Sequence, residues 1–358
     1  MKVLQLIDTL QTGGAERLAV NYANGLSRLG VDSHICATRA EGLLLNTIDD
    51  NVGYLFLNRS KTIDFRAIFK LRSYLILNKI DIIHAHASSY FFATLVKVTL
   101  PRIKIVWHDH YGNSELLSQR PKRVLSLCSL RFSYAFCVNQ KLKAWNKEHL
   151  FVKKIKYIKN FPVLKKSQKN LTLLKGVEGK RLLCLANLRD QKNHSMLLDA
   201  FKIVNNEFPD WSLHCVGKDF DDKCSRQFFS KIKSLKLNKS VHFYDSKTDI
   251  LNIMSQCEIG LLSSKSEGLP LALLEYGMSG LPVVVTDVGD CSLLVNDKSF
   301  GQLVDKNDYK QFAESIKQLI LDKDYRLFCA DNLNQKVTRE YSEKHVLSDI
   351  ISIYKSII

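Results

Sequence analysis

Short apolar runs alternate along this chain with segments of helical periodicity, and the pattern is clearest in the second half. Residues 259–262 and 282–285 are apolar runs of strand length, and the segment between them has the spacing of a helix. Pro270 falls in the first turn of that predicted helix, where its missing N–H would have had no partner anyway. Strand, loop, helix and strand in this order predict a βαβ unit. The polar loop 263–268 then lies at the carboxyl end of a strand, where open α/β sheets bind ligands.

The same alternation continues through the rest of the chain and predicts two domains. A strand at 2–8, a glycine loop and a helix at 15–29 open the first domain in the manner of a doubly wound sheet. We predict an α/β protein with Rossmann-like domains at 1–165 and 178–338, a polar linker between them, and a C-terminal helix within 339–358. Further strands are predicted at 31–38, 53–57, 81–86, 103–107 and 133–139, the last closing the first domain, and at 182–186, 211–216 and 241–244.

The composition is that of a globular protein. The chain has 358 residues, of which 46% are hydrophobic, and this is enough for two domains with separate cores. No apolar run approaches the length of a transmembrane helix, and residues 1–14 fit a first strand better than a signal peptide. The nine cysteines include no C-x-x-C pair, which indicates reduced core residues and a cytoplasmic location.

The formal net charge of +16 makes nucleic acid, anionic lipid and acidic substrates candidate partners. Basic residues are dense between 119 and 169, and apolar residues interleave them. This fits an anionic membrane surface, and an ordinary solvated lysine-rich surface explains it equally well. The basic residues are Arg120, Lys122, Arg123, Lys141, Lys143, Lys153, Lys154, Lys156, Lys165 and Lys166, and the apolar ones are Leu125, Leu127, Leu130, Phe132, Trp145 and Phe151.

Two glutamates of the central segment have a spacing that suits a diphosphate. Glu267 lies in the loop and Glu275 about one and a half turns into the predicted helix, so the helical part of the spacing spans roughly 9 Å. The N–H groups of Gly268, Leu269 and the first helical turn would face the phosphates, where the helix dipole favours negative charge. A carboxylate accepts two hydrogen bonds at once, which suits vicinal hydroxyls. Two solvated glutamates are the alternative, and the strand–loop–helix context favours the binding site.

Residues 267–275, EGLPLALLE, place two glutamates with seven residues between them, and this segment resembles the donor site of family 4 glycosyltransferases. These are retaining enzymes of the GT-B fold. The resemblance covers nearly the whole chain, since GGAER at 13–17 is a common form of the family's first glycine loop. It implies two Rossmann-like domains facing a cleft, with the final helix returning to the first domain. It also implies sugar transfer from a nucleoside-diphosphate sugar to an acceptor hydroxyl.

The resemblance also assigns roles to single residues. Glu275 would hold the ribose, Lys192 and Arg189 the diphosphate, and Asn187 stands where relatives carry the usual arginine. A capping charge explains Glu16 equally well, and a structural role explains the two acceptor-side histidines. The implied catalytic residues are His110 and Glu267; the donor-binding residues are Gly14, Arg189, Lys192, Gly217, Gly268, Leu269 and Glu275; and the acceptor side comprises Gly13, Glu16, His84 and His86.

Two patterns raise the question of a metal. Histidines 84, 86, 108 and 110 follow two predicted strands and are compatible with zinc. We favour no metal, because no other ligand type is placed there and parallel strand ends collect polar residues in any case. Asp219-Phe220-Asp221 spells the D-x-D of metal-dependent GT-A enzymes, which we interpret as chance in a GT-B chain. We therefore expect neither a metal nor another cofactor.

The implied donor is a UDP-sugar in preference to a GDP-sugar, and the implied acceptor is a glycan or a lipid-linked glycan. The implied setting is bacterial surface or capsular polysaccharide synthesis, at the inner face of the membrane. One alternative is another GT-B nucleotide-sugar enzyme, such as a UDP-sugar 2-epimerase. A non-catalytic basic protein that binds nucleic acid or another polyanion is the second, and the clustered site motifs argue against it. We expect no nucleic-acid partner.

Overall fold

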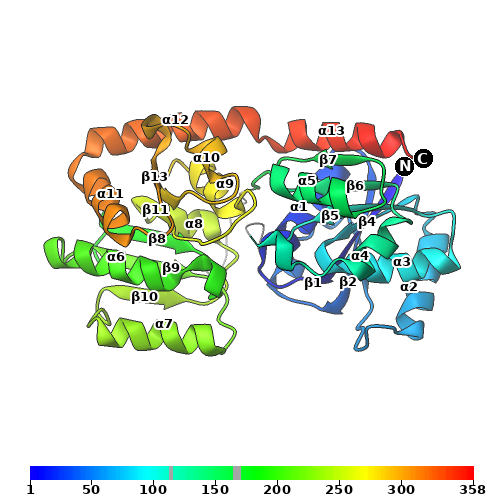
Figure 1. Ribbon diagram of the computed structural model, residues 1–358, viewed down its shortest axis with the longest axis horizontal. Helices are drawn as coiled ribbons and strands as arrows, with labels where there is room; N and C mark the ends of the chain where they lie inside the picture. Colours follow the sequence, from blue (N-terminus) through cyan, green and yellow to red (C-terminus); the bar gives the residue numbers. More distant parts are fainter. Residues whose placement is uncertain (113–115, 164–170) are drawn as a thin grey trace. The chain divides into compact units, whose positions relative to one another are not determined.

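The computed structural model describes residues 1–112, 116–163 and 171–358, and it divides into two compact units (Figure 1). Unit 1 comprises Met1–Phe161 and Glu343–Ile358, and unit 2 comprises Pro162–Ser342. The sequence placed the corresponding boundaries at 165, at 178 and 338, and at 339. The returning segment begins later than 339 because the helix before it runs on to Glu340. Part of the predicted linker, residues 166–170, lies outside the described residues.

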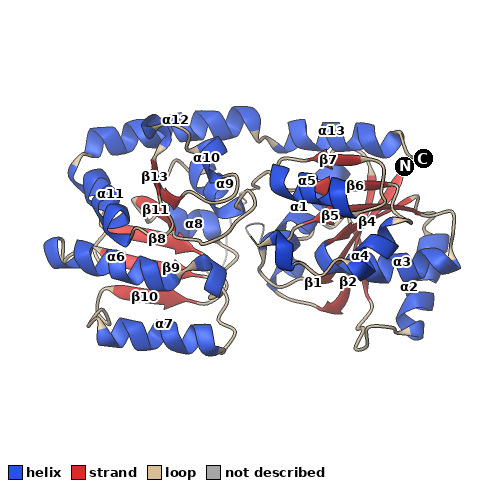
Figure 2. Cartoon of the chain, in the orientation of Figure 1, coloured by secondary structure: helices blue, strands red, loops and turns tan. Residues whose placement is uncertain are grey.

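Within the described residues, unit 1 is built on a seven-stranded sheet in the order β3-β2-β1-β4-β5-β6-β7, and the strand pairs are parallel (Figure 2). The strand order reverses between β1 and β4, which is the doubly wound topology. The strands are β1 (Lys2–Thr9), β2 (Asp32–Ala40), β3 (Gly53–Phe56), β4 (Ile82–His86), β5 (Lys104–Asp109), β6 (Tyr134–Cys137) and β7 (Ile155–Tyr157). The α-helices are α1 (Gly14–Arg28), α2 (Phe65–Leu77), α3 (Tyr90–Thr99), α4 (Arg123–Ser129), α5 (Gln140–His149) and α13 (Glu343–Lys355).

Unit 2 repeats this architecture with six parallel strands in its described part, in the order β10-β9-β8-β11-β12-β13. None of its described helices, or of those in unit 1, has the length and apolar character needed to cross a bilayer. The strands are β8 (Arg181–Leu185), β9 (Ser212–Val216), β10 (Val241–Tyr244), β11 (Ile259–Leu262), β12 (Val283–Thr286) and β13 (Gln302–Val304). The α-helices are α6 (His194–Glu207), α7 (Lys223–Ser234), α8 (Ile250–Met254), α9 (Leu271–Met278), α10 (Cys291–Leu294), α11 (Tyr309–Leu321) and α12 (Lys323–Glu340).

Side chains alternate between the two faces of the unit 1 sheet, as the pleat of a strand requires. Leu4, Ile83 and Ile105 belong to a buried core that also includes apolar side chains of α2, α3 and α4. The neighbouring positions on the same strands point to the opposite face, where α1 and α13 lie. On that face His84 contacts Tyr22 of α1 and Tyr354 of α13.

The final helix α13 is part of unit 1 because one side of it is apolar. Val346, Ile350 and Tyr354 recur at i, i+4 and i+8 and are buried, as the sequence pattern predicts. The helix packs beside α1, and Glu343 at its start forms an ion pair with Arg28 at the end of α1. The chain therefore begins and ends in the same unit.

Three local predictions were wrong. The segment 133–139 does not hold the last strand of the first domain, because β7 follows it at the sheet edge. The edge strand β13 was also not foreseen. Pro270 is the N-cap of α9, with an extended backbone (φ −68°, ψ 127°), and so precedes the first helical turn that was predicted to contain it.

Candidate active site

The loops that leave β8 and β11 bring two predicted site residues of unit 2 together. Lys192 Nζ lies 2.5 Å from Glu267 Oε1, and Ser264 Oγ donates to the same oxygen at 2.6 Å. Glu267 is 6% exposed, so its charge is held mainly by these partners. The pair sits at the carboxyl ends of neighbouring parallel strands, where the βαβ pattern predicts a ligand site.

Backbone hydrogen bonds hold these two loops in register. Lys265 N donates to Gln191 O at 2.7 Å, and Ser263 Oγ donates to Lys192 O at 3.0 Å. Lys265 Nζ also pairs with Asp190 at 2.8 Å. The position of the Lys192 ammonium is therefore set by the β11 loop as well as by its own.

A third loop, after β12, supports the backbone beside Glu267. Asp290 N donates to Gly268 O at 2.9 Å. Gly289 has a positive φ of 57°, and a Cβ there would lie 2.3 Å from Glu267 O and 2.5 Å from Gly268 O. Only glycine fits this close approach without moving the backbone of the site.

Helix α9 begins directly after the β11 loop, so its N-terminus lies at the same carboxyl edge of the unit 2 sheet. Leu269 anchors the loop with a side chain that is 2% exposed, and Pro270 O accepts the first helical hydrogen bond from Leu274 N at 3.4 Å. Glu275 lies in the second turn and is 6% exposed. The positive end of the α9 dipole and two buried carboxylates thus lie along one short segment.

Arg189 lies in the β8 loop, as predicted, but its contact is with an aromatic residue that no sequence motif selects. Its guanidinium lies 3.5 Å from the ring centroid of Phe220, in the loop after β9. Asn187 Oδ1 accepts from Lys218 N at 2.7 Å, so this residue ties the two loops. Gly217 has a φ of 159°, and a Cβ there would lie 2.3 Å from Ala186 O.

The Asp219-Phe220-Asp221 tripeptide forms a local turn. Asp219 Oδ1 accepts from Asp221 N at 2.8 Å and from Ser225 Oγ. Asp222 then caps α7 through Cys224 N and Ser225 N. These contacts account for Asp219 as a turn residue, and the interpretation of D-x-D as chance stays a prediction.

In unit 1, the two glycines between β1 and α1 differ in their surroundings. A Cβ on Gly13 would lie 2.1 Å from Glu16 Oε2, whereas a Cβ on Gly14 would meet no atom within 4 Å. Glu16 folds back on Gly13 and accepts from Thr9 Oγ1 at 3.4 Å, and burial raises the pKa of its carboxyl. A Cβ on Gly13 would therefore displace the Glu16 carboxylate, whereas Gly14 is open to solvent.

The four predicted histidines of unit 1 form one cluster. His86 Nδ1 lies 3.0 Å from His110 Nε2, His86 Nε2 lies 2.9 Å from Gln5 Oε1, and His84 Nδ1 lies 2.7 Å from Tyr354 Oη. His84, His86 and His108 are 0% exposed, which favours a structural role over the acceptor-side role for the first two. Burial lowers the pKa of His110 to about 3, so this ring is neutral at physiological pH.

The basic and apolar segment between 119 and 169 is only partly a surface. Arg120 is buried and donates both guanidinium nitrogens to Asp109 at 2.8 Å, while Leu125, Phe132 and Trp145 lie in the core. Lys156 pairs with Asp349, and Lys165 and Lys166 lie outside the described residues. The exposed members are Lys122, Arg123, Leu127, Leu130, Lys141, Phe151, Lys153 and Lys154.

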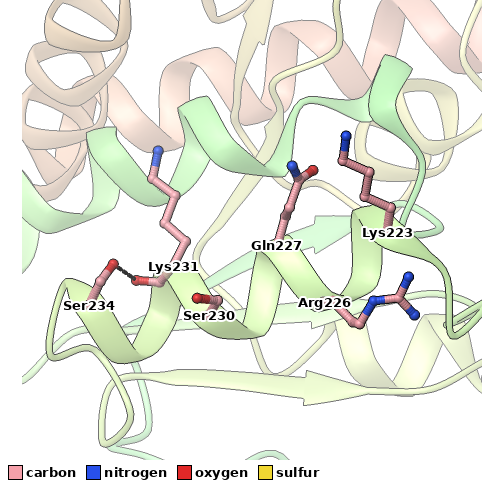
Figure 3. A pocket seen from close by; sticks show the side chains of 6 residues that line it. All are labelled: Lys223, Arg226, Gln227, Ser230, Lys231 and Ser234. Atoms are coloured by element: carbon pink, nitrogen blue, oxygen red, sulfur yellow. Dashed lines mark hydrogen bonds between the residues drawn. The ribbon is translucent and has the colours of Figure 1, made fainter.

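A shallow hollow of about 480 Å³ lies along α7, away from the predicted site residues (Figure 3). It is lined by Lys223, Arg226, Gln227, Ser230, Lys231 and Ser234. Lys231 is paired with Asp199 at 2.5 Å and donates to Ser195 at 2.8 Å. This hollow contains none of the carboxylates or glycine loops that mark the site in unit 2.

Comparison with known proteins agrees with this geometry. Residues 12–161 match the family model described as Glycosyltransferase Family 4, and residues 165–336 match the one described as Glycosyl transferases group 1. An uncharacterized glycosyltransferase of Haemophilus influenzae is 25% identical over 97% of this chain and 96% of its own length. The UDP-Gal:alpha-D-GlcNAc-diphosphoundecaprenol alpha-1,3-galactosyltransferase of Escherichia coli is 25% identical over 88% of this chain and 87% of its own.

A solved structure shares the fold. The crystal structure of Anabaena Alr3699/HepE in complex with UDP and glucose covers 99% of this chain and 100% of its own, with a TM-score of 0.81 and 17% identity. The predicted GT-B class, with two Rossmann-like domains, is thereby confirmed. The two family models together span nearly the whole sequence, and this protein belongs to the family 4 (group 1) glycosyltransferases of the GT-B fold.

Proposed function

We propose that this enzyme transfers a sugar from a UDP-sugar to a hydroxyl of a lipid-linked glycan, with retention of anomeric configuration, in bacterial surface polysaccharide synthesis. The observation that carries the proposal is the Lys192–Glu267 pair at the carboxyl edge of the unit 2 sheet, beside the N-terminus of α9. The Escherichia coli relative is named for transfer to a diphosphoundecaprenol-linked sugar, which supports the acceptor class. A relative from Campylobacter jejuni is likewise named for an undecaprenol-linked acceptor.

The roles follow from charge and position. When the glycosidic bond breaks, negative charge develops on the departing diphosphate, and preorganised cations and N–H groups stabilise it. Lys192, Arg189 and the amides of Gly268 and Leu269 would supply this stabilisation. Glu275 would bind the ribose hydroxyls.

Glu267 would hold the hydroxyls of the donor sugar and is poorly suited to be a nucleophile. Its Oε1 already accepts from Lys192 and Ser264, and each hydrogen bond lowers the availability of its electron pairs. Retention without a protein nucleophile requires attack from the face of the leaving group, with a departing phosphate oxygen taking the acceptor's proton. His110, neutral and hydrogen-bonded to His86, would orient the sugar.

The same arrangement supports sugar transfer, with departure of the diphosphate, without a divalent metal ion. Two basic side chains and a helix N-terminus already provide positive potential at this edge. Asp219, the residue that would anchor a D-x-D metal site, is engaged by Asp221 N and Ser225 Oγ.

A lipid-linked acceptor calls for a membrane-facing surface, and unit 1 carries a suitable one. The neighbouring helices α2, α3 and α4 expose large apolar side chains, among them Phe65 at 70%, Phe69 at 56% and Leu127 at 65%. We call these three helix faces the apolar–basic surface. Its exposed cations, each worth about 1 kcal/mol near an anionic bilayer, are Arg66, Lys70, Lys122 and Arg123.

The test measures UDP released from UDP-sugars with and without a polyprenyl-diphosphate-linked sugar as acceptor. We expect release to depend on the acceptor, and the anomeric proton coupling of the product to match that of the donor. UDP release without acceptor, together with a changed sugar, would indicate the 2-epimerase alternative. An inverted product would contradict retention.

A further inference from the structure

We propose that His84, His86 and His108 form a binding site for a divalent transition-metal ion of the Zn²⁺ class inside unit 1. One nitrogen from each ring belongs to a group whose atoms all lie within 4.8 Å of one another. The proposed site is separate from the diphosphate chemistry of unit 2, and its role is to stabilise unit 1.

Strand register explains why these rings meet. His84 and His86 alternate along β4 and therefore point to the same face of the sheet. His86 pairs with His108 on β5, and His84 pairs with Gln5 on β1. Tyr22 of α1 covers the group, with its ring centroid 5.2 to 5.8 Å from those of the three histidines.

Buried nitrogens without partners mark the centre of this group. His84 Nε2 and both ring nitrogens of His108 have no hydrogen-bond partner, and both residues are 0% exposed. A buried polar atom without a partner costs about 1–3 kcal/mol. Such atoms in one place indicate a missing partner, and a cation that binds His84 Nε2 and one ring nitrogen of His108 satisfies two of the three.

The outer contacts orient the rings as metal-binding histidines require. A ligating imidazole usually donates its other N–H to a fixed acceptor, which settles its tautomer. His86 Nε2 donates to Gln5 Oε1 at 2.9 Å, and its Nδ1, which lies 3.0 Å from His110 Nε2, would exchange that hydrogen bond for the metal. His84 Nδ1 is bonded to Tyr354 Oη at 2.7 Å, which leaves Nε2 pointing to the group. Gln5 and Tyr354 thus act as positioning residues.

The ligand type and geometry select the class of metal. Three neutral imidazoles suit Zn²⁺, Cu²⁺ or Ni²⁺ rather than Mg²⁺ or Ca²⁺, which prefer oxygen ligands. Ligands about 2.05 Å from a tetrahedral Zn²⁺ lie about 3.4 Å apart, so the rings need to converge by roughly an ångström. Rotation about the side-chain torsions supplies such a shift without moving the strands.

The experiment uses the full-length protein after treatment with a chelator. Titration with Co²⁺ should give one bound equivalent with the visible absorption of a tetrahedral, nitrogen-ligated ion, and Zn²⁺ should displace it and raise the melting temperature. His108→Ala should abolish this binding. His345→Ala, which removes an exposed histidine from the same unit, should retain it.

A second variant keeps the test decisive if His108→Ala fails to fold. Gln5→Leu removes the acceptor for His86 and should weaken Zn²⁺ binding by about 10- to 100-fold. Absence of a stoichiometric Co²⁺ or Zn²⁺ site in the wild-type protein would overturn the proposal. Equal Zn²⁺ affinity in wild type and Gln5→Leu, or in wild type and His108→Ala, would overturn it as well. All these readouts are independent of transferase activity, so they leave the proposed function untouched.

Discussion

The ammonium group of Lys192 and the carboxylate of Glu267, 75 residues apart in sequence, form an ion pair of 2.5 Å in which the carboxylate is almost fully buried. A buried ion pair resists the loss of one partner because the other charge is then left uncompensated. The pair therefore has two separable consequences, one for stability and one for catalysis.

Lys192→Met should lower kcat/KM by about 10²- to 10³-fold, because it removes a cation from the developing diphosphate charge. It should also destabilise unit 2 by about 1–3 kcal/mol, because Glu267 loses its charged donor. The measurements are UDP-release kinetics and denaturant unfolding.

The double variant Lys192→Met/Glu267→Gln separates the two effects. We expect it to recover most of the lost stability, because a neutral amide needs no cation, while activity stays low. Recovery of activity along with stability would show that Lys192 acts only as a structural partner of Glu267.

Gly14→Ala tests whether a ligand approaches the first glycine loop. A Cβ at this position meets nothing within 4 Å, and alanine is the better helix former by about 1 kcal/mol. The melting temperature should therefore be unchanged or higher, while kcat/KM falls if substrate lies against the backbone. Gly13→Ala, where the Cβ would meet Glu16, should be the less stable variant. Wild-type kinetics for Gly14→Ala would remove Gly14 from the site.

The apolar–basic surface predicts reversible binding to anionic vesicles. Phe69→Ser should lower the partition coefficient by about tenfold or more, since a buried phenylalanine contributes about 1.5–3 kcal/mol. Phe328→Ser is the matched control, because Phe328 of unit 2 is 55% exposed and Phe69 is 56% exposed. Vesicle co-sedimentation at 0.1 and 1 M salt measures both variants. Pelleting that is equal with neutral vesicles, or insensitive to salt, would argue against this surface.

Because of a buried histidine, we expect the sheet of unit 2 to be less stable in acid. Burial lowers the pKa of His214 to about 3, and its ring contacts Ser212, His242 and Tyr244. In the unfolded chain His214 takes up a proton near pH 6.5, whereas in the folded chain it stays neutral at that pH. The folded state therefore loses stability as the pH drops below 6.5.

At pH 5 the resulting loss from His214 is about 2 kcal/mol relative to neutral pH. Hydrogen exchange at β9, compared between pH 7 and pH 5, should show this loss in the wild type and a smaller one in His214→Gln. An identical pH dependence in the two proteins would exclude His214 as its origin.

Transfer should proceed without added Mg²⁺ or Mn²⁺, because we propose that Lys192, Arg189 and the start of α9 stabilise the diphosphate. Initial rates in EDTA are the measurement, with Mg²⁺, Mn²⁺ and Zn²⁺ added back separately. If EDTA abolishes turnover, and Mg²⁺ or Mn²⁺ restores it but Zn²⁺ does not, metal-independent transfer is contradicted. Asp219 would then be the candidate metal ligand.

The sequence pattern was sufficient to predict the fold, because the buried strands of a parallel sheet are continuous apolar runs in the sequence. The bounds of β10 and β11 were predicted to the residue, whereas β7 and β13, of three residues each, are too short to show a period. Site residues could be selected by motif, but their pairings could not. Arg120 was assigned to the surface because nothing local reveals that Asp109, eleven residues earlier, binds it in the core.

The histidine cluster also shows that contacts between distant residues cannot be predicted from local sequence. Each histidine is visible in the sequence at the end of an apolar run, but the register that sets His86 beside His108 belongs to the sheet. The covering residues Tyr22 and Tyr354 come from helices at opposite ends of the chain, so no local pattern predicts that the cluster is buried.

The hydrogen bond between Tyr354 and His84 joins residues 270 positions apart, and it imposes an order on biosynthesis. The described strands of unit 1 are complete once Phe161 is translated, but α13 is translated only after unit 2. At about 5–20 residues per second, roughly 10–40 s separate the two events. During that interval the sheet face with His84 lacks its outer helix while the whole of unit 2 is translated. The nascent first part of unit 1 therefore lacks one of its covering helices until residues 343–355 have been translated.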